Sequence, residues 1–230
     1  MTSGSHFLTF DCYGTLVDWE EGISAAFAKI ARSQGREIDG RRVLEHHAQI
    51  EPRVQAEEFQ AYRDVLDLTA VGVATELGLE LPAEQQHFLS DSLPSWRPFA
   101  ETGAALERLK DAGYRLGILS NVDDDLLAGT LEHLPVRFDL LVTAEQVGSY
   151  KPATGHFQEA RRRIGEESSW LHVAQSFFHD VIPACAMQIP VVWINRKDEA
   201  PMSSAPSEAV FPDLTSFVDR LLGPGLSIGS

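Results

Sequence analysis

The 230-residue sequence predicts an α/β fold, a doubly wound parallel sheet with a helical domain inserted after its first strand. Three observations support this prediction. The strand-like segments are continuous apolar runs without polar alternation, as strands covered on both faces require. From residue 97 onward these runs alternate with helical patterns, which is typical of parallel βαβ units. Between them, a long segment after the first apolar run contains no convincing strand.

Each element of the sheet is predicted from an apolar run bounded by polar or turn residues, and each helix from apolar residues at helical spacing. The expected strands are 6–12, 115–120, 138–143, 170–176 and 190–195, and the expected helices are 101–112, 123–133, 155–164, 180–187 and 213–222.

The inserted segment has a different pattern of apolar residues from the rest of the chain. Apolar residues such as Ile23, Phe27 and Ile30 recur at helical spacing, and prolines such as Pro52 and Pro94 punctuate the segment. A block of this size is best interpreted as a small domain. The predicted division is an α/β core over 1–18 and 97–224, a helical domain over 19–96 and a flexible tail over 225–230.

Composition excludes several classes of protein. The net charge of −15 argues against nucleic-acid binding and means that any site for an anion must be built locally. There is no apolar run of about 18 residues, no basic tract for a membrane surface and no signal-peptide pattern. Cys12 and Cys185 are the only cysteines and are not expected to pair, so the sequence predicts a cytoplasmic protein without a membrane partner.

Asp11 is the first candidate catalytic residue. It follows the apolar run 6–10 and precedes a Gly14-Thr15 turn, and the carboxyl end of a strand is where open α/β sheets bind ligands. Gly14 permits a sharp turn close to a ligand. A carboxylate held there can act as a nucleophile and form an ester. For an isolated Asp, a turn or helix cap is the alternative.

The full string from Asp11 to Asp18, DCYGTLVD, resembles the first motif of the haloacid dehalogenase (HAD) superfamily. The aromatic residue Tyr13, at the second position after Asp11, resembles the pattern of the L-2-haloacid dehalogenase branch. HAD phosphatases usually carry an Asp at this position as the general acid. Later strand ends resemble the other three motifs, and together they cover nearly the whole chain. These are Ser120-Asn121, Lys151-Pro152 and the stretch that ends at Asp180. The resemblance implies a Rossmann-like core with a helical cap.

The resemblance implies three catalytic residues. Asp11 attacks C2 of a 2-haloacid, displaces halide and forms an ester that water hydrolyses. Lys151 is expected to keep Asp11 ionised by lowering its pKa. Asp180 is expected to hold Lys151 or to activate the water. Its alternative role is the N-cap of the following helix.

Five further residues of the core are expected to bind the substrate. Ser120 and Thr15 are expected to contact its anionic group, with helix cap and turn hydroxyl as their alternatives. Asn121 is expected to hold the leaving halide. Tyr13 and Phe177 are expected to line the pocket, and Phe177 belongs to a predicted apolar wall. The other members of that wall are Phe59, Trp96, Phe157 and Phe178. Plain packing is the alternative for each aromatic residue.

The helical domain is expected to supply a cation for the substrate. Dehalogenases of this type use an Arg followed by an aromatic residue six positions on and a second Arg ten positions on. Arg53, Phe59 and Arg63 fit this pattern, and Arg41 and Arg42 are the rival candidates.

The fourth motif departs from the family pattern S-S-N-x-x-D. Gln175 stands for the first Ser and Phe177 for the Asn, and Phe157 stands where a Tyr is usual after Lys151. Gln175 and His179 are the candidates for compensating this loss. His172 and His179 are also candidate general bases, although a His beside a strand is more often structural.

The preferred function is hydrolysis of a small 2-haloalkanoic acid without metal or other cofactor. One alternative is a HAD phosphatase, which needs Mg²⁺ held by Asp11, the Tyr13 carbonyl and acidic residues of the fourth motif. Ser176 stands where such an enzyme places its first acidic residue of that motif. The other alternative is a non-catalytic binding protein on the same scaffold. The expected partner is a small anionic substrate, and the sequence leaves a homodimer open.

Overall fold

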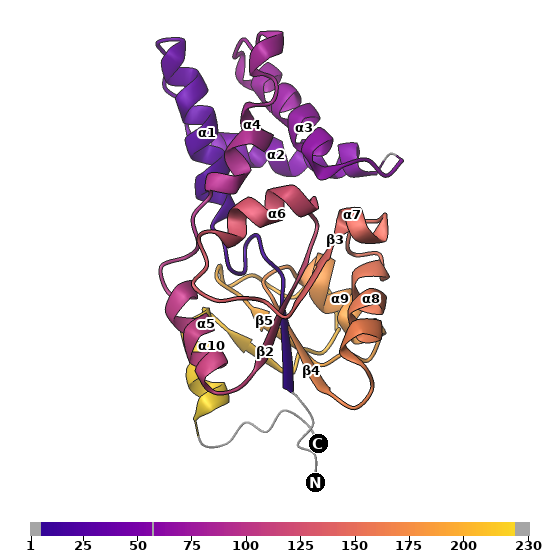
Figure 1. Cartoon of the computed structure of the whole chain (residues 1–230). Helices are drawn as coiled ribbons and strands as arrows, with labels where there is room; N and C mark the ends of the chain where they lie inside the picture. Colours follow the sequence, from indigo (N-terminus) through magenta and orange to yellow (C-terminus); the bar gives the residue numbers. More distant parts are fainter. Residues whose placement is uncertain (1–5, 57, 224–230) are drawn as a thin grey trace. The chain divides into compact units, whose positions relative to one another are not determined.

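The computed structural model describes residues 6–56 and 58–223. The chain forms two compact units (Figure 1). The first, here called the core unit, takes its described residues from Met1–Val17, Pro98–Asn121 and His133–Ser230. The second, here called the helical unit, consists of Asp18–Arg97 and Val122–Glu132. The predicted tail at 225–230 lies outside the described residues.

The core unit contains a parallel sheet of six strands in the order β3-β2-β1-β4-β5-β6, which confirms the predicted α/β class. The chain builds the sheet outward from β1 to β3 and then continues on the other side of β1 with β4. The order in which the chain adds strands to the sheet therefore reverses between β1 and β4. Doubly wound sheets open a ligand crevice at this point. The strands are β1 (His6–Phe10), β2 (Arg115–Ser120), β3 (Leu140–Thr143), β4 (Ser169–Ala174), β5 (Val191–Ile194) and β6 (Ala209–Phe211).

Helices cover both faces of this sheet. In Figure 1, α5 and α10 lie together on one face, and α8 and α9 lie on the other. A buried cluster joins α8 and α9 to the strands and includes Phe157, Val142 and Trp193. Burial on both faces explains why the strands are continuously apolar. The helices of this unit are α5 (Thr102–Asp111), α7 (Ala144–Val147), α8 (Gly155–Ile164), the π-helix η3 (Phe177–Val181), α9 (Ile182–Ala186) and α10 (Leu214–Leu222).

The five predicted strands are confirmed; the strand at 115–120 has the predicted boundaries, and the other four are shorter than predicted. The strand predicted to reach Cys12 ends at Phe10, because the Cys12 carbonyl accepts the N–H groups of Leu16 and Val17 and closes a turn. The strand predicted to reach Ser176 ends at Ala174, and the helix expected from 180 begins at Phe177 as a π turn. The strand β6 was not predicted, because three residues carry too little pattern to detect.

The helical unit contains only helices, turns and loops among its described residues, as predicted for 19–96. Aspartates begin two of its helices: Asp18 accepts the N–H of Glu21, and Asp39 accepts that of Arg41. Pro52, one of the prolines expected to punctuate this segment, lies inside the last turn of α2. The helices are α1 (Trp19–Ser33), α2 (Gly40–Gln55), α3 (Tyr62–Leu77), η1 (Ala83–Gln85), α4 (Phe88–Ser92), η2 (Leu93–Ser95) and α6 (Asp124–Leu131).

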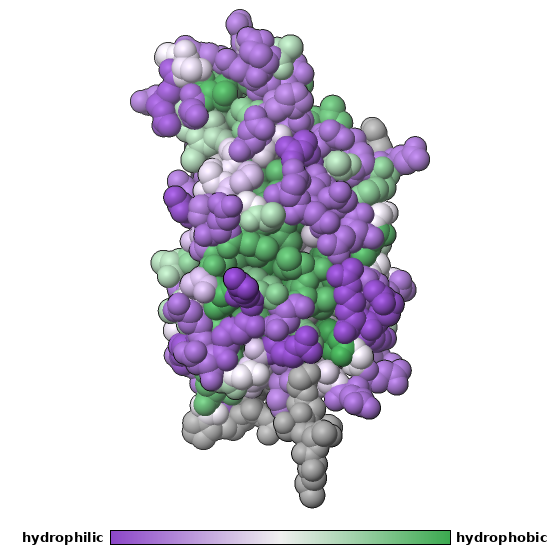
Figure 2. Space-filling model, in the orientation of Figure 1, coloured by the Kyte–Doolittle hydropathy of each residue, from purple (hydrophilic) through white to green (hydrophobic). Residues whose placement is uncertain are grey.

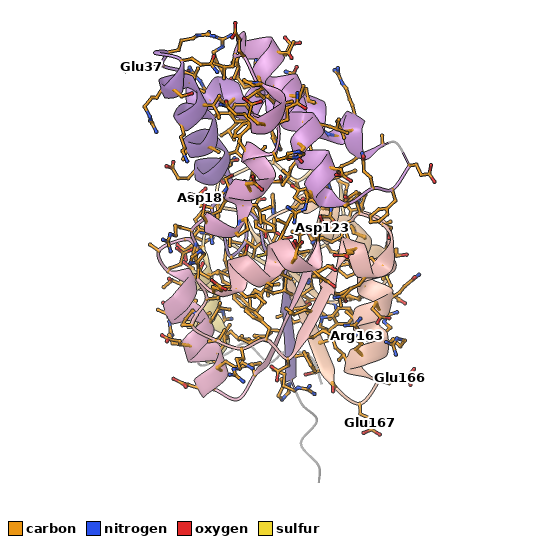
Figure 3. The ribbon with its side chains drawn as sticks, turned by 45° about the horizontal axis from the view of Figure 1, so that its top comes forward. Asp18, Glu37, Asp123, Arg163, Glu166 and Glu167 are labelled. Atoms are coloured by element: carbon orange, nitrogen blue, oxygen red, sulfur yellow. The ribbon has the colours of Figure 1, made fainter. Side chains whose placement is uncertain are left out.

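The segment around α6 belongs to the helical unit, whereas the sequence placed it in the α/β core. Asp123, labelled in Figure 3, stands at the start of α6 but does not cap that helix. Its carboxylate accepts the N–H groups of Tyr62 and Arg63 at 2.7 and 2.8 Å. The start of α3, which has no capping side chain of its own, is therefore capped from a distant segment.

Within residues 6–56 and 58–223, no helix is long and apolar enough to cross a membrane. Hydrophilic residues cover most of the helical unit on the face shown in Figure 2. Cys12 is buried next to Asp11, and Cys185 lies in α9 with its thiol on the Pro206 carbonyl.

Candidate active site

The candidate site lies at the carboxyl ends of three neighbouring strands of the core unit. Asp11 follows β1, Ser120 is the last residue of β2, and Gln175 follows β4. Parallel strands all end at the same edge of a sheet, so the motif residues that the sequence places at strand ends converge here.

Lys151 joins the two predicted catalytic aspartates. Its Nζ donates to Asp11 Oδ1 at 2.9 Å, to Asp180 Oδ1 at 2.6 Å and to the Leu119 carbonyl at 2.8 Å. The Lys151 side chain is 1% exposed. An ammonium has three N–H donors, so each of them has an acceptor inside the protein. This buried trio of Asp11, Lys151 and Asp180 is here called the charged triad.

The charged triad carries a net negative charge when all its groups are ionised. Burial opposes ionisation of Asp180, but Lys151 and a hydrogen bond from His172 outweigh it and lower the pKa of Asp180 to about 2. The two carboxylates outweigh burial at Lys151 and raise its pKa. Lys151 lowers the pKa of Asp11 as predicted, but burial, aided by the charge of Asp180, outweighs this effect, and the net pKa of Asp11 is raised.

Thr15 supports the nucleophile directly. Its Oγ1 donates to Asp11 Oδ2 at 2.9 Å and accepts the N–H of Gln175 at 2.9 Å. The expected contact between Thr15 and the substrate is not supported, since the hydroxyl proton is already donated to Asp11.

Arg196, which the sequence analysis missed, holds the same turn from the loop after β5. Its guanidinium donates to the carbonyls of Gly14 and Thr15 at 3.2 and 2.8 Å. It also pairs with Glu101 at 2.7 Å and lies over the Phe99 ring. The only feature of the sequence that pointed to Arg196 was its position, as a polar residue just beyond the end of a predicted strand.

Ser120 offers an unused donor to a ligand. Its Oγ is buried and has no hydrogen-bond partner in the described part of the chain, so the helix-cap alternative is wrong. The carbonyl of Ser120 accepts from Nε2 of the buried His156 at 3.0 Å. Burial, aided by Lys151, lowers the pKa of His156 to about 4, so this imidazole is neutral at pH 7.

Asn121 holds the backbone of Lys151. Its Oδ1 accepts the Lys151 N–H at 2.7 Å, and its Nδ2 donates to the Lys151 carbonyl at 3.1 Å. One N–H of the amide is not used in this pair of bonds. Asn121 therefore positions Lys151, and its expected contact with halide remains a prediction for that second N–H.

Asp180 is not the N-cap of a helix, since Ser176 occupies that position and accepts the N–H of His179. The carboxylate is fully buried. Its Oδ1 accepts from Lys151 and lies 3.0 Å from His172 Nε2. Its Oδ2 has no hydrogen-bond partner among the described residues. The sequence treated His172 as structural or as a general base and did not link it to Asp180.

The aromatic residues of the core unit divide between interior and surface. Phe177 is buried in edge contact with Trp193, with ring centroids 4.9 Å apart. Phe157 packs edge-on to His172 at 5.2 Å, whereas Phe178 is exposed. Packing accounts for Phe177 and Phe157, and a substrate contact by Phe177 stays a prediction.

The remaining aromatic candidates have different surroundings. Tyr13 is half-buried and forms an isolated bridge with Val17. In the helical unit, Phe59 is exposed, and Trp96 packs closely on Gly22.

The candidate arginines of the helical unit differ in their partners. Arg53 lies exposed in the last turn of α2 without an ion pair to any described residue, and so does Arg42 near the start of that helix. Arg63 pairs with Asp125, and Arg41 with Asp39.

The residues present do not fit the magnesium site of the phosphatase alternative. In the described ranges no group of three or more His, Cys, Asp or Glu side chains is arranged to hold a metal. Both oxygens of Asp11 and Oδ1 of Asp180 accept hydrogen bonds from Lys151, Thr15 or His172. Ser176 supplies a hydroxyl where the phosphatase pattern requires a carboxylate.

The fold and this site define a hydrolase of the HAD type, and the comparisons agree. The model of the haloacid dehalogenase-like hydrolases matches residues 7–173, so the chain belongs to this family of enzymes. The chain is 31% identical over 199 residues to an (S)-2-haloacid dehalogenase of Pseudomonas putida, covering 84% of this chain and 86% of that protein. It is 30% identical over 145 residues to a glyceraldehyde 3-phosphate phosphatase of Methanothermobacter thermautotrophicus, covering 60% and 62%.

A solved structure shares the fold. The L-2-haloacid dehalogenase from Xanthobacter autotrophicus with chloropropionic acid covalently bound superposes with a TM-score of 0.76 at 17% identity. The match covers 96% of this chain and 100% of that one.

Proposed function

We propose that the protein is a 2-haloacid dehalogenase, which converts a small 2-haloalkanoic acid to a 2-hydroxy acid without a metal or organic cofactor. The observation that carries the proposal is a buried Asp11 whose carboxylate is held between Lys151 and Thr15. The (S)-2-haloacid dehalogenases among the relatives support it.

In the first step, an oxygen of Asp11 attacks C2 of the substrate. The carbon–halogen bond breaks, the halide leaves with the bonding electrons, and an ester forms between Asp11 and C2. Asp11 is only 7% exposed, so its carboxylate is poorly hydrated and must shed little water before it attacks. Lys151 opposes the effect of burial and favours the ionised nucleophile.

The free hydroxyl of Ser120 binds the substrate carboxylate during this step, and the second N–H of Asn121 faces the leaving halide. Tyr13 and Phe177 complete the pocket wall. Chloropropionic acid is covalently bound in a structural neighbour, which supports a covalent intermediate in this reaction.

In the second step, water attacks the carbonyl carbon of the ester. The bond between that carbon and the ester oxygen breaks, which frees the 2-hydroxy acid and restores the Asp11 carboxylate. One proton of the water passes to Oδ2 of Asp180, which has no hydrogen-bond partner among the described residues, and the other becomes the hydroxyl proton of the product. The low pKa of Asp180 keeps this carboxylate ionised at neutral pH.

The helical unit serves as the cap of this enzyme, with residues 19–96 as its main part. The charged triad is net negative, so it cannot by itself attract a carboxylate substrate. We assign the missing cation to Arg53, which has no competing ion pair among the described residues. We also place the enzyme in the cytoplasm with a small anionic substrate as its partner, and we leave the homodimer open, as the sequence does.

The test is halide release from L- and D-2-haloacids without added metal, with Asp11→Asn as the blank. A single turnover in ¹⁸O-water then identifies the atom attacked. The ester route places ¹⁸O in Asp11 first and leaves the first product unlabelled. Label in that first product would instead mean direct attack of water on C2 and would refute the ester.

The phosphatase alternative has one supporting observation, the archaeal glyceraldehyde 3-phosphate phosphatase among the relatives. Magnesium-dependent release of phosphate from glyceraldehyde 3-phosphate, with no halide release from any haloacid, would favour it over the dehalogenase. The unsuitable donor set around Asp11 and Asp180 predicts no such release.

A further inference from the structure

We infer that His172 is a positioning residue, which fixes the Asp180 carboxylate so that one oxygen holds Lys151 and the other stays free for water. The inference rests on the proposed function, because the water belongs to the second step of that reaction. It also identifies what replaces the polar groups lost at Phe157 and Phe177.

A continuous hydrogen-bond chain connects the sheet to the charged triad. His172 and Thr9 are register partners on β4 and β1. Thr9 Oγ1 lies 2.8 Å from His172 Nδ1 and accepts from Trp170 Nε1 at 2.7 Å. His172 Nε2 lies 3.0 Å from Asp180 Oδ1. Thr9, His172 and Asp180 are each 0% exposed, so bulk solvent does not compete for these bonds.

Gly117 makes room for this chain on the neighbouring strand. It is the register partner of Thr9 on β2, and a Cβ added there would lie 3.2 Å from Thr9 Cγ2 and 3.0 Å from Leu140 Cβ. A larger residue at 117 would therefore press on Thr9. On the other side, Phe157 meets the edge of the His172 ring with carbon only.

The donors in the chain have one consistent arrangement. An ionised carboxylate only accepts, so Nε2 of His172 carries the proton that is donated to Asp180 Oδ1. An indole N–H only donates, so Trp170 donates to Thr9, and the Thr9 hydroxyl has a proton of its own to direct at Nδ1 of His172. This assignment follows from the hydrogen-bond inventory, and it makes Nε2 of a fixed ring the donor to Asp180.

These hydrogen bonds fix the orientation of the Asp180 carboxylate. Two donors, Lys151 Nζ and His172 Nε2, meet at Oδ1, and their two directions fix the plane of the carboxylate. Oδ2 is then held without a hydrogen-bond partner in the part of the chain that the structure describes. The predicted compensation by Gln175 is not seen at Asp180: the Gln175 backbone binds Thr15 and Trp193 instead.

The first test is ¹⁵N NMR of the resting enzyme, with the His172 signals identified by their loss in His172→Leu. We expect Nε2 of His172 to carry a proton. A signal from the tautomer that is protonated at Nδ1 alone would overturn the inference. Because no substrate is involved, this result is independent of the proposed function.

The second test separates the two chemical steps. Rapid quench follows halide release, and mass spectrometry follows the ester on Asp11. In His172→Leu we expect hydrolysis of the ester to slow about 10²-fold or more, while halide release changes less than about tenfold, so the ester accumulates. His172→Gln, which retains an N–H donor, should recover at least about tenfold of the lost rate.

His6→Leu is the matched control, because His6 bonds to Ser169 across the same two strands at their opposite end. It should leave both steps unchanged. Equal slowing of both steps in His172→Leu, or no slowing, would overturn the positioning role. If the wild type releases no halide, the proposed function fails, and the NMR result still decides the assignment of His172.

Discussion

Lys151 Nζ lies 2.9 Å from Asp11 Oδ1 and 2.6 Å from Asp180 Oδ1, so one buried cation serves two carboxylates. The pKa values of the two carboxylates shift in opposite directions. Asp180 receives a further hydrogen bond from His172, and its pKa falls to about 2. At Asp11, burial together with the charge of Asp180 outweighs the opposing charge of Lys151, and the pKa of Asp11 rises. Opposite shifts in neighbouring titratable groups separate their roles in catalysis.

The first prediction is that two isosteric substitutions change stability differently. The folded pKa of Asp180 is below the unfolded value, so its contribution is present above about pH 4 and is lost as pH falls toward 2. Asp180→Asn should therefore lower the free energy of unfolding at pH 7 by roughly 2 kcal/mol. The folded pKa of Asp11 is raised, so its ionisation costs stability above the ordinary Asp value, and Asp11→Asn should be as stable as the wild type or more so.

Urea denaturation of the wild type and both variants at pH 7 measures this difference. At a pH below the ordinary Asp value, the loss in Asp180→Asn should shrink. A loss in Asp11→Asn as large as that in Asp180→Asn would contradict the assigned directions.

The second prediction concerns the cap of α3. Asp123→Ala removes the acceptor for the N–H groups of Tyr62 and Arg63, and we expect a loss of about 1–2 kcal/mol in unfolding free energy. Hydrogen exchange at the two amides should accelerate. Glu132→Ala, an exposed change in the same segment, is the control. Unchanged exchange at Tyr62 and Arg63 would show that Asp123 does not cap α3 in solution.

The third prediction concerns the cation assigned to the substrate. Arg53→Ala should reduce kcat/KM for a 2-haloacid by 10²-fold or more, roughly the cost of one lost charge-assisted contact in a desolvated site. Arg42→Ala is the matched control, because both arginines are exposed on α2 and neither forms an ion pair with any described residue. We expect less than about a twofold effect there. Equal, small effects would remove Arg53 from the site.

The fourth prediction is a pH dependence within the helical unit. His87 Nδ1 lies 2.6 Å from Asp67 Oδ2, and this hydrogen bond raises the pKa of His87. A raised folded pKa means that the stabilisation is complete below about pH 6.5 and is lost as pH rises through the folded value. Between pH 6 and 9, Tm of the wild type should therefore fall more than Tm of His87→Gln. Parallel curves for the two proteins would show that the pair does not contribute.

Local patterns determined much of this protein. Continuous apolar runs predict the strands that flank and form the site, because burial on both faces of a parallel sheet leaves no room for polar alternation. Strand-end positions and motif spacing then bring Asp11, Ser120, Lys151 and Asp180 into one region, since the carboxyl ends of parallel strands share one edge. The three-residue β6 and the π turn at Phe177 were not predicted, because so few residues cannot display the periodic spacing of apolar residues that identifies a strand or a helix.

Only the tertiary structure decided which group each polar atom bonds. The bond from Lys151 to Asp11 spans 140 residues, that between Thr9 and His172 spans 163, and the cap from Asp123 to Tyr62 spans 61. No local pattern encodes such partners, because each depends on strand order and register rather than on neighbours in sequence. The raised pKa of Asp11 belongs to the same class, because burial and the charge of Asp180 act there only after folding places them.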